Sequence, residues 1–254
     1  MKEPEVLAAL KAQGQRLLPK ARAICNDAIH DLLKDHLTDL SWIKKNFSLL
    51  VEQIQIKAYK LYLQKERAVV SKSFKNVFSP LLPKDPKVID FFNLFEENFW
   101  ALDRLFLSLS QGRRGRAGKT FEYIIKDLFN ILKYPYDSQP LINGQPDFLL
   151  PSASHFQKNA MDCIIFTVKR TLRERWRQIV TEGTRGYLFF LATIDEKITS
   201  KQLQQIQSHR IYVVVPNRIK NKTYSAHSNV ISFETFFKQH IDPAMRRWQQ
   251  NKII

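Results

Sequence analysis

Short apolar runs in the second half of the chain constrain its fold more than any other feature. Their Ile, Val, Phe and Tyr content is typical of buried strands, and the runs are Phe148 to Leu150, Cys163 to Val168, Tyr187 to Ala192 and Ile211 to Val215. Segments with a helical pattern, residues 171–182 and 200–208, alternate with them. This alternation predicts an α/β core, in which helices cover a central sheet.

The first part of the chain has a different pattern. Residues 1 to about 75 carry apolar side chains at steps of three and four, as in Leu33, Leu37 and Leu40, which predicts helices. Phe78 to Val88 holds three prolines and is expected to be a connection, and a second helical pattern runs from Ile89 to about Ser110.

We therefore expect two parts. Residues 1–103 would form a helical region used for dimerisation or for embracing a ligand, and residues 104–254 would form the core that carries the chemistry.

The charge of the chain indicates its class of partner. It has 40 Lys and Arg against 24 Asp and Glu, a net charge of +16 and a pI near 9.8. Such a balance favours a polyanion, with nucleic acid ahead of a membrane surface, although a basic surface without any special partner is the plain alternative.

Several other classes are not supported by the composition. Charged residues interrupt the first thirty positions, so no signal peptide is expected, and no apolar run approaches membrane-spanning length. The two cysteines, Cys25 and Cys163, are too far apart for a zinc knuckle. We expect a cytoplasmic protein with reduced thiols and no membrane partner.

Two polar residues stand at the ends of predicted strands. An apolar run ends abruptly at Lys169, and 22 residues earlier Asp147 directly precedes another run. A carboxylate can hold Mg²⁺, and an ammonium can orient a water and stabilise charge on a phosphate, so the pair suits metal-assisted phosphodiester cleavage. Taken singly, each has a plainer interpretation: a Pro-Asp pair usually opens a turn, and a lysine at a strand end usually meets solvent.

A second carboxylate is needed to hold the ion, and Glu182 follows Lys169 by thirteen residues. Thirteen residues of helix span about 20 Å, so Glu182 reaches the site only if a turn folds the helix back along the sheet. The residues alone leave this open.

These motifs together resemble a known family. Pro146-Asp147, the stretch Lys169-Arg170-Thr171-Leu172-Arg173-Glu174-Arg175-Trp176-Arg177-Gln178, and Glu182 resemble the type II restriction endonucleases grouped with EcoRII, SsoII and PspGI, over about residues 104 to 195. The resemblance implies the PD-(D/E)XK nuclease fold, with a mixed central sheet flanked by helices. It also implies Mg²⁺-dependent cleavage of double-stranded DNA at sites of the CCNGG or CCWGG type.

The same resemblance assigns catalytic roles. Asp147 and Glu182 would hold Mg²⁺ and Lys169 would act on the water, whereas Thr167 stands where the common motif has an acid, a place that Glu182 would fill from the helix. Glu122 matches a carboxylate aimed at the metal region, and a capping or solvated glutamate is its alternative interpretation.

Arg173, Glu174 and Arg175 are candidates for reading bases. Arginine can donate twice to guanine and glutamate can accept from cytosine N4, so the trio suits adjacent G·C pairs. A solvated helix face with internal ion pairs is the alternative. We also expect Arg170, next to Lys169, to contact DNA.

A second basic cluster lies at residues 111–119. We expect phosphate or minor-groove contacts here, with the three glycines allowing close approach of the backbone; the candidates are Gln111, Arg113, Arg114, Arg116 and Lys119. The string GRAGKT mimics a nucleotide-binding loop, but Arg113 occupies the position of a required glycine, so ATP binding is rejected.

A near-palindromic target implies a two-fold homodimer, and the resemblance implies a cognate cytosine DNA methyltransferase as a system partner. Some relatives extrude bases, but aromatic candidates such as Trp42, Tyr59 and Tyr62 are left unassigned because such residues are more often core. The rival hypotheses are a structure-selective repair nuclease of the same fold and a non-catalytic DNA-binding protein.

Overall fold

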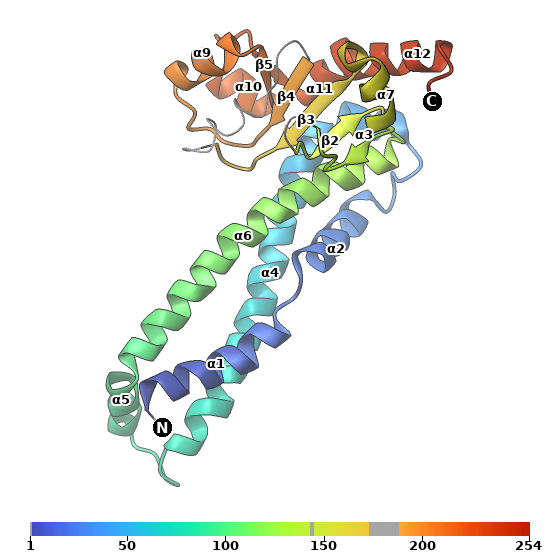
Figure 1. Cartoon of the computed structure of the whole chain (residues 1–254). Coiled ribbons are helices and arrows are strands. Elements are labelled where there is room, and N and C mark those ends of the chain that lie inside the picture. Colours follow the sequence, from blue (N-terminus) through green and yellow to red (C-terminus); the bar gives the residue numbers. More distant parts are fainter. Residues whose placement is uncertain (1, 143–144, 173–187) are drawn as a thin grey trace. The chain divides into compact units, whose positions relative to one another are not determined.

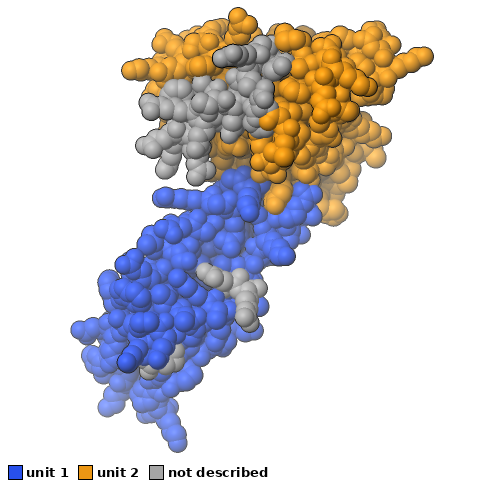
Figure 2. Space-filling view, viewed as in Figure 1, with its two compact units in different colours: residues 1–28, 56–120 blue, residues 29–55, 121–254 orange. Residues whose placement is uncertain are grey.

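The computed structural model describes residues 2–142, 145–172 and 188–254, without the side chains of residues 15 and 16. The chain divides into two compact units that are not contiguous in sequence (Figure 2). Unit 1 comprises residues 1–28 and 56–120, and unit 2 comprises residues 29–55 and 121–254. The functional division at residues 103 and 104 stays a prediction.

Unit 1 is helical. Its elements come from α1 (Glu3–Leu17), α2 (Ala21–Leu33), α4 (Phe47–Phe78), the short 3₁₀ turn η1 (Ser79–Leu81), α5 (Val88–Glu97) and α6 (Phe99–Ile131), of which α2, α4 and α6 continue into unit 2. Within the unit α1 packs against α4 and α6 (Figure 1). The core here is small and aliphatic, and its buried members are Val6, Leu10, Val77, Ala101, Leu105 and Leu109.

Unit 2 contains a six-stranded sheet in the order β1 to β6, and α3 (Leu40–Lys45) also belongs to it. The strands are β1 (Asp137–Ser138), β2 (Phe148–Leu150), β3 (Ile164–Val168), β4 (Leu188–Ala192), β5 (Ile211–Val215) and β6 (Val230–Ser232). The first two pairings are antiparallel and the others parallel, so the sheet is mixed.

Between and after the strands lie short helices, namely α7 (Ala153–Lys158), η2 (Ala160–Asp162), α9 (Ser200–Ser208), α10 (Asn217–Thr223), α11 (Phe233–Phe236), the π-helical η4 (Phe237–Ile241) and α12 (Asp242–Gln250). Local sequence explains one of these starts. Thr199 accepts from the amide of Gln202, whose side chain accepts from the amide of Thr199, and this reciprocal capping begins α9.

The two faces of the sheet are covered differently because alternate residues of each strand point to opposite sides. Ile165 and Leu191 face a cluster that includes Leu203 of α9 and Ile219 of α10. On the other face Phe166 lies 5.3 Å from Phe129 of α6 and 5.0 Å from Phe236 of α11, between ring centroids. Both faces are therefore buried, as the near-continuous apolar runs of the strands require.

The expected helices at residues 1–75, the connection after Phe78, the helix at 200–208 and the four strand regions are confirmed for the described residues. One expectation is wrong. The second helical pattern does not stop near Ser110, because α6 continues without a break through the glycine-containing cluster to Ile131.

Candidate active site

Asp147 and Lys169 lie side by side at one edge of the sheet. The antiparallel register pairs Phe148 with Phe166, so the residue before β2 lies beside the residues that end β3. The ammonium Nζ of Lys169 is 3.3 Å from Oδ2 of Asp147. Two side chains 22 residues apart are thus brought together by strand pairing.

Oδ2 of Asp147 accepts two further hydrogen bonds. The hydroxyl of Thr167 donates at 2.8 Å and the backbone amide of Val168 donates at 2.7 Å. Asp147 is 8% exposed and Thr167 is 1% exposed, so these bonds form where water cannot replace them. Thr167 therefore orients the carboxylate of Asp147, a role that the sequence did not indicate.

The donor chemistry at Asp147 fits a hard cation. All three contacts fall on Oδ2, and within residues 2–142, 145–172 and 188–254 none is recorded for Oδ1, which leaves one carboxylate oxygen for a metal. The same described ranges hold no group of three or more His, Cys, Asp or Glu that could bind a metal by themselves. A complete metal centre therefore needs a further ligand.

Glu182 and the trio Arg173, Glu174 and Arg175 lie outside the described residues. Glu122 is a partly buried residue of α6. It lies on α6 together with Lys119, because this helix continues through the basic cluster.

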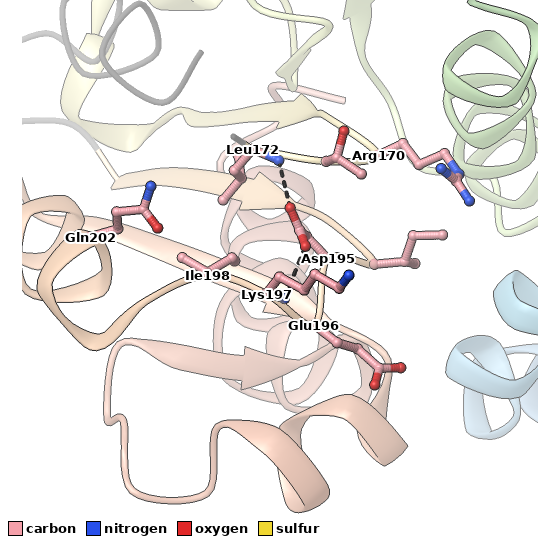
Figure 3. Close-up of a pocket in the computed structure, with 9 residues that line it drawn as sticks. Arg170, Leu172, Asp195, Glu196, Lys197, Ile198 and Gln202 are labelled. Atoms are coloured by element: carbon pink, nitrogen blue, oxygen red, sulfur yellow. Dashed lines mark hydrogen bonds between the residues drawn. The ribbon is translucent and has the colours of Figure 1, made fainter. Parts of the chain in front are cut away.

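Asp195, which the sequence analysis missed, holds the chain that leaves β3. Its Oδ2 accepts from the amide of Leu172 at 2.9 Å, and its Oδ1 accepts from the amide of Lys197 at 2.9 Å (Figure 3). The hydroxyl of Thr193 also donates to the carbonyl of Arg170, at 3.1 Å. The only signal in the sequence is that Thr193 and Asp195 directly follow an apolar strand.

Arg170, Leu172, Asp195 and Lys197 are among the residues that line a hollow of about 520 Å³. Figure 3 shows the Arg170 side chain extending away from Asp195, while Ile198 and Gln202 line another side. Arg170 is exposed, as a contact with a polyanion requires. Its lining includes Arg170, the residue that directly follows Lys169 in the sequence.

The basic cluster of unit 1 is helical and its arginines have unequal surroundings. Arg113 donates from Nε to Oε1 of Glu66 at 2.8 Å and also binds the same oxygen through Nη2 at 2.5 Å. Glu66 is buried and accepts from the hydroxyl of Tyr62 at 2.7 Å. This hydrogen bonding to Glu66 raises the pKa of Arg113, despite partial burial of the guanidinium.

The other polar residues of the basic cluster also differ in how exposed they are. The guanidinium of Arg116 lies 5.0 Å from the ring centroid of Tyr62, whereas Gln111, Arg114 and Lys119 are exposed. All three glycines of the cluster lie inside α6, so the close approach of a ligand to the backbone that they are expected to allow would be an approach to a helix.

The aromatic candidates also differ. The ring of Trp42 stacks on His36 with centroids 3.7 Å apart, Tyr62 is buried with a raised pKa caused by burial and by Glu66, and Tyr59 is half-exposed. No helix of the described chain is both long and apolar enough to cross a membrane.

Comparison with known proteins places this site in a family. The family profile described as EcoRII C terminal matches residues 64–237. The type II restriction enzyme SsoII of Shigella sonnei is 28% identical over 156 residues, 57% of this chain and 51% of that protein. The type II restriction enzyme EcoRII of Escherichia coli is 28% identical over 152 residues, 56% of this chain and 37% of that protein. The aligned part thus spans about half or less of these relatives.

Solved structures support the fold. Metal-depleted Ecl18kI in complex with uncleaved, modified DNA has a TM-score of 0.85 at 22% identity, covering 98% of this chain and 86% of that chain. The complex of the restriction endonuclease PspGI with substrate DNA has a TM-score of 0.69 at 20% identity, covering 91% and 94%. The expected restriction-endonuclease-like fold and the resemblance to the EcoRII, SsoII and PspGI group are confirmed. Because the profile match covers more than half of the chain and includes both Asp147 and Lys169, the chain belongs to the EcoRII C-terminal family.

Proposed function

We propose that this chain is a type II restriction endonuclease that uses Mg²⁺ to cut double-stranded DNA at a short CC and GG site of the CCNGG or CCWGG type. Its products would carry 5′-phosphate and 3′-hydroxyl ends. The family membership and the net charge of +16 support DNA as the substrate.

The observation that carries the proposal is the arrangement of Asp147 and Lys169. A buried carboxylate with one oxygen held by the Thr167 hydroxyl and the Val168 amide stands 3.3 Å from an ammonium at the end of β3. A lysine that only met solvent would not need a buried carboxylate beside it, and an unpaired buried carboxylate would be costly.

Each group has a part in the reaction. Asp147 would hold Mg²⁺ through its other oxygen, together with Glu182. Bound there, Mg²⁺ supplies positive charge to the scissile phosphate and favours ionisation of a water. Lys169 would position or polarise a water for in-line attack on the scissile phosphate. The new P–O bond would form as the bond to the 3′ oxygen breaks, and the 3′ oxygen would take up a proton.

Recognition would rest on Arg173, Glu174 and Arg175, which follow Leu172 directly. Contacts to the DNA backbone or minor groove would come from four exposed residues, Gln111, Arg114, Lys119 and Arg170. Arg116 and Arg113, which is hydrogen-bonded to Glu66, are less exposed members of the same set. Exchange of Glu174 for Gln should weaken discrimination at C·G pairs by about 1–3 kcal/mol per lost base contact.

A two-fold homodimer would cut both strands of a near-palindromic site, and a cognate cytosine methyltransferase would protect the host DNA. The helical region at residues 1–103 would serve dimerisation or embrace DNA, and residues 104–254 would carry catalysis.

Plasmid cleavage with Mg²⁺ tests the proposal. Discrete fragments with CC and GG at their ends support it, a smear or cutting only of branched DNA indicates a repair nuclease, and intact DNA indicates a binding protein. Lys169→Ala should reduce cleavage roughly 10²–10³-fold, the cost of removing one stabilising donor, while DNA binding persists. Lys197→Ala, which removes an exposed lysine of the nearby hollow, is the matched control and should cut normally.

A further inference from the structure

The short helix α5 presents an apolar face to solvent. Val88, Phe91, Phe92 and Phe95, followed by Phe99 at the start of α6, lie at helical steps of three and four, and their exposed fractions range from 43% to 73%. We call these five residues the α5 face. Among the described residues α5 has no buried side chain, so this face is not part of the core of unit 1.

The exposed area is large for a protein without a partner. Ile89 and Trp100, next in sequence to members of the α5 face, are also exposed. At roughly 200 Å² for a large apolar side chain, the seven exposed fractions correspond to about 800 Å². The largest apolar patch of a typical monomer is about 300–600 Å², whereas one side of a stable protein interface buries about 800 Å².

The charges around the α5 face indicate what covers it. Lys84 and Lys87 precede α5, and Glu96 and Glu97 end it. None of the four forms an ion pair with another described residue. Basic residues before a helix and acidic residues at its end oppose the helix dipole, so this charge order is not explained by the stability of α5 alone.

A second α5 in antiparallel orientation would bring the basic residues before one helix next to the acidic residues at the end of the other. The ten residues of α5 span about 15 Å, so a two-fold axis at the middle of the helix brings Lys87 of one copy to Glu97 of the other, and the reverse. Asp90 is already used in its own chain, where it accepts from the amide of Lys87 at 2.7 Å.

We infer that the α5 face is a self-association surface, on which α5 of a second copy of this chain packs antiparallel, with Phe92 and Phe95 at the centre and Lys87–Glu97 pairs at both rims. The inference rests on the proposed function only for the expectation of a two-fold assembly. It adds the surface on which that assembly forms.

Sedimentation velocity of the full chain, without DNA or Mg²⁺, tests the inference over a range of concentrations. The wild type should reach twice the chain mass of 29.9 kDa. Phe92→Ser combined with Phe95→Ser should raise the dissociation constant more than tenfold. Leu141→Ser removes an even more exposed apolar side chain in unit 2 and should leave the mass unchanged.

Charge exchange separates self-association from binding of another molecule. Lys87→Glu alone and Glu97→Lys alone should each weaken the dimer, and the two together should restore it, because each copy then regains an opposite partner. A different protein or a lipid surface on the α5 face would give no such rescue.

Three outcomes would overturn the inference: a wild type that stays at 29.9 kDa throughout, a dimer whose mass the Phe92 and Phe95 changes leave intact, or a double charge variant no tighter than the single ones. Circular dichroism of each variant checks folding. The Lys169→Ala variant, in which cleavage is expected to be strongly reduced, should still dimerise, so loss of cleavage and loss of association are measured separately.

Discussion

The backbone amide of Leu172 is held by the carboxylate of Asp195 through a hydrogen bond of 2.9 Å. The same carboxylate accepts from the amide of Lys197, so it joins the segment after β3 to the segment after β4. Leu172 lies between Lys169 and the trio that begins at Arg173. The contact therefore fixes the backbone three residues after the proposed catalytic lysine.

Asp195→Ala should lower stability and slow cleavage together. Hydrogen bonds to a charged group contribute about 1.5–3 kcal/mol, and a loss of this order is expected in urea unfolding. Asp195→Asn keeps one carbonyl acceptor and should lie between Ala and the wild type. The control is Glu196→Ala, which removes a carboxylate that is 41% exposed and bound to Arg218. Wild-type unfolding and cleavage in Asp195→Ala would mean that other contacts hold Leu172.

Thr167→Val should impair cleavage without creating a cavity in the core. The substitution keeps the size of a fully buried side chain but removes the hydroxyl that donates to Asp147 at 2.8 Å. One hydrogen bond of about 1.4 kcal/mol corresponds to a tenfold lower rate, measured in single-turnover cleavage at saturating DNA. Higher Mg²⁺ should recover part of the rate, because a less well-oriented carboxylate binds the ion more weakly.

Thr223→Val, on an exposed helix end, should cleave as the wild type does. A Thr167→Val variant with unchanged rate and Mg²⁺ dependence would show that Val168 and Lys169 suffice to orient Asp147.

The strands and the Asp147–Lys169 pair were predictable because their signals are local. A short apolar run that ends in a charged residue reports a buried strand reaching the edge of a sheet, and two such ends can meet. The continuation of α6 was not predictable in this way. Glycines favour a break locally, but Arg113 binds Glu66, 47 residues away, and Arg116 lies on Tyr62. Asp195 was missed for the same reason, since its partner Leu172 is 23 residues distant.

Arg113 and Arg114 are neighbours with opposite expected behaviour. Arg113→Ala leaves the buried Glu66 without its cation and should cost about 2–3 kcal/mol, below the range for fully buried pairs because Arg113 is partly exposed. Arg114→Ala should change stability by less than about 0.5 kcal/mol. It should instead reduce by about one the slope of log DNA affinity against log salt. Stability loss in Arg114→Ala, or none in Arg113→Ala, would contradict this division.

Gly115 and Gly118 should trade stability against DNA binding. A Cβ added at either position meets nothing within 4 Å among the described residues, so no internal packing requires glycine there. Each Gly→Ala change should therefore stabilise α6, by about 0.5–1 kcal/mol in thermal or urea unfolding. If the DNA backbone approaches this helix closely, the same variants should bind DNA more weakly. An increase in both stability and DNA affinity would mean that the DNA backbone does not approach α6 closely at these glycines.

The ionised carboxylate of Asp162 should stabilise the fold, and its protonation in acid should remove this stabilisation. Oδ1 of Asp162 accepts from Arg247 at 2.6 Å, and Oδ2 contacts Nε2 of His155 at 2.9 Å. Burial alone would raise the pKa of this carboxyl, but the hydrogen bonds outweigh burial and lower the pKa below its ordinary 3.8. The folded state therefore takes up the proton less readily than the unfolded state. The stabilisation is complete above pH 3.8 and is lost as the pH falls through the folded value.

Asp162→Asn should thus be less stable than the wild type at pH 7, with a difference that shrinks as the pH falls below 3.8. Urea unfolding at a series of pH values measures this. Asp85→Asn, at an exposed position between prolines, should follow the wild-type curve at every pH. A constant difference between Asp162→Asn and the wild type from pH 7 to pH 3 would mean that packing, not ionisation of Asp162, sets the effect.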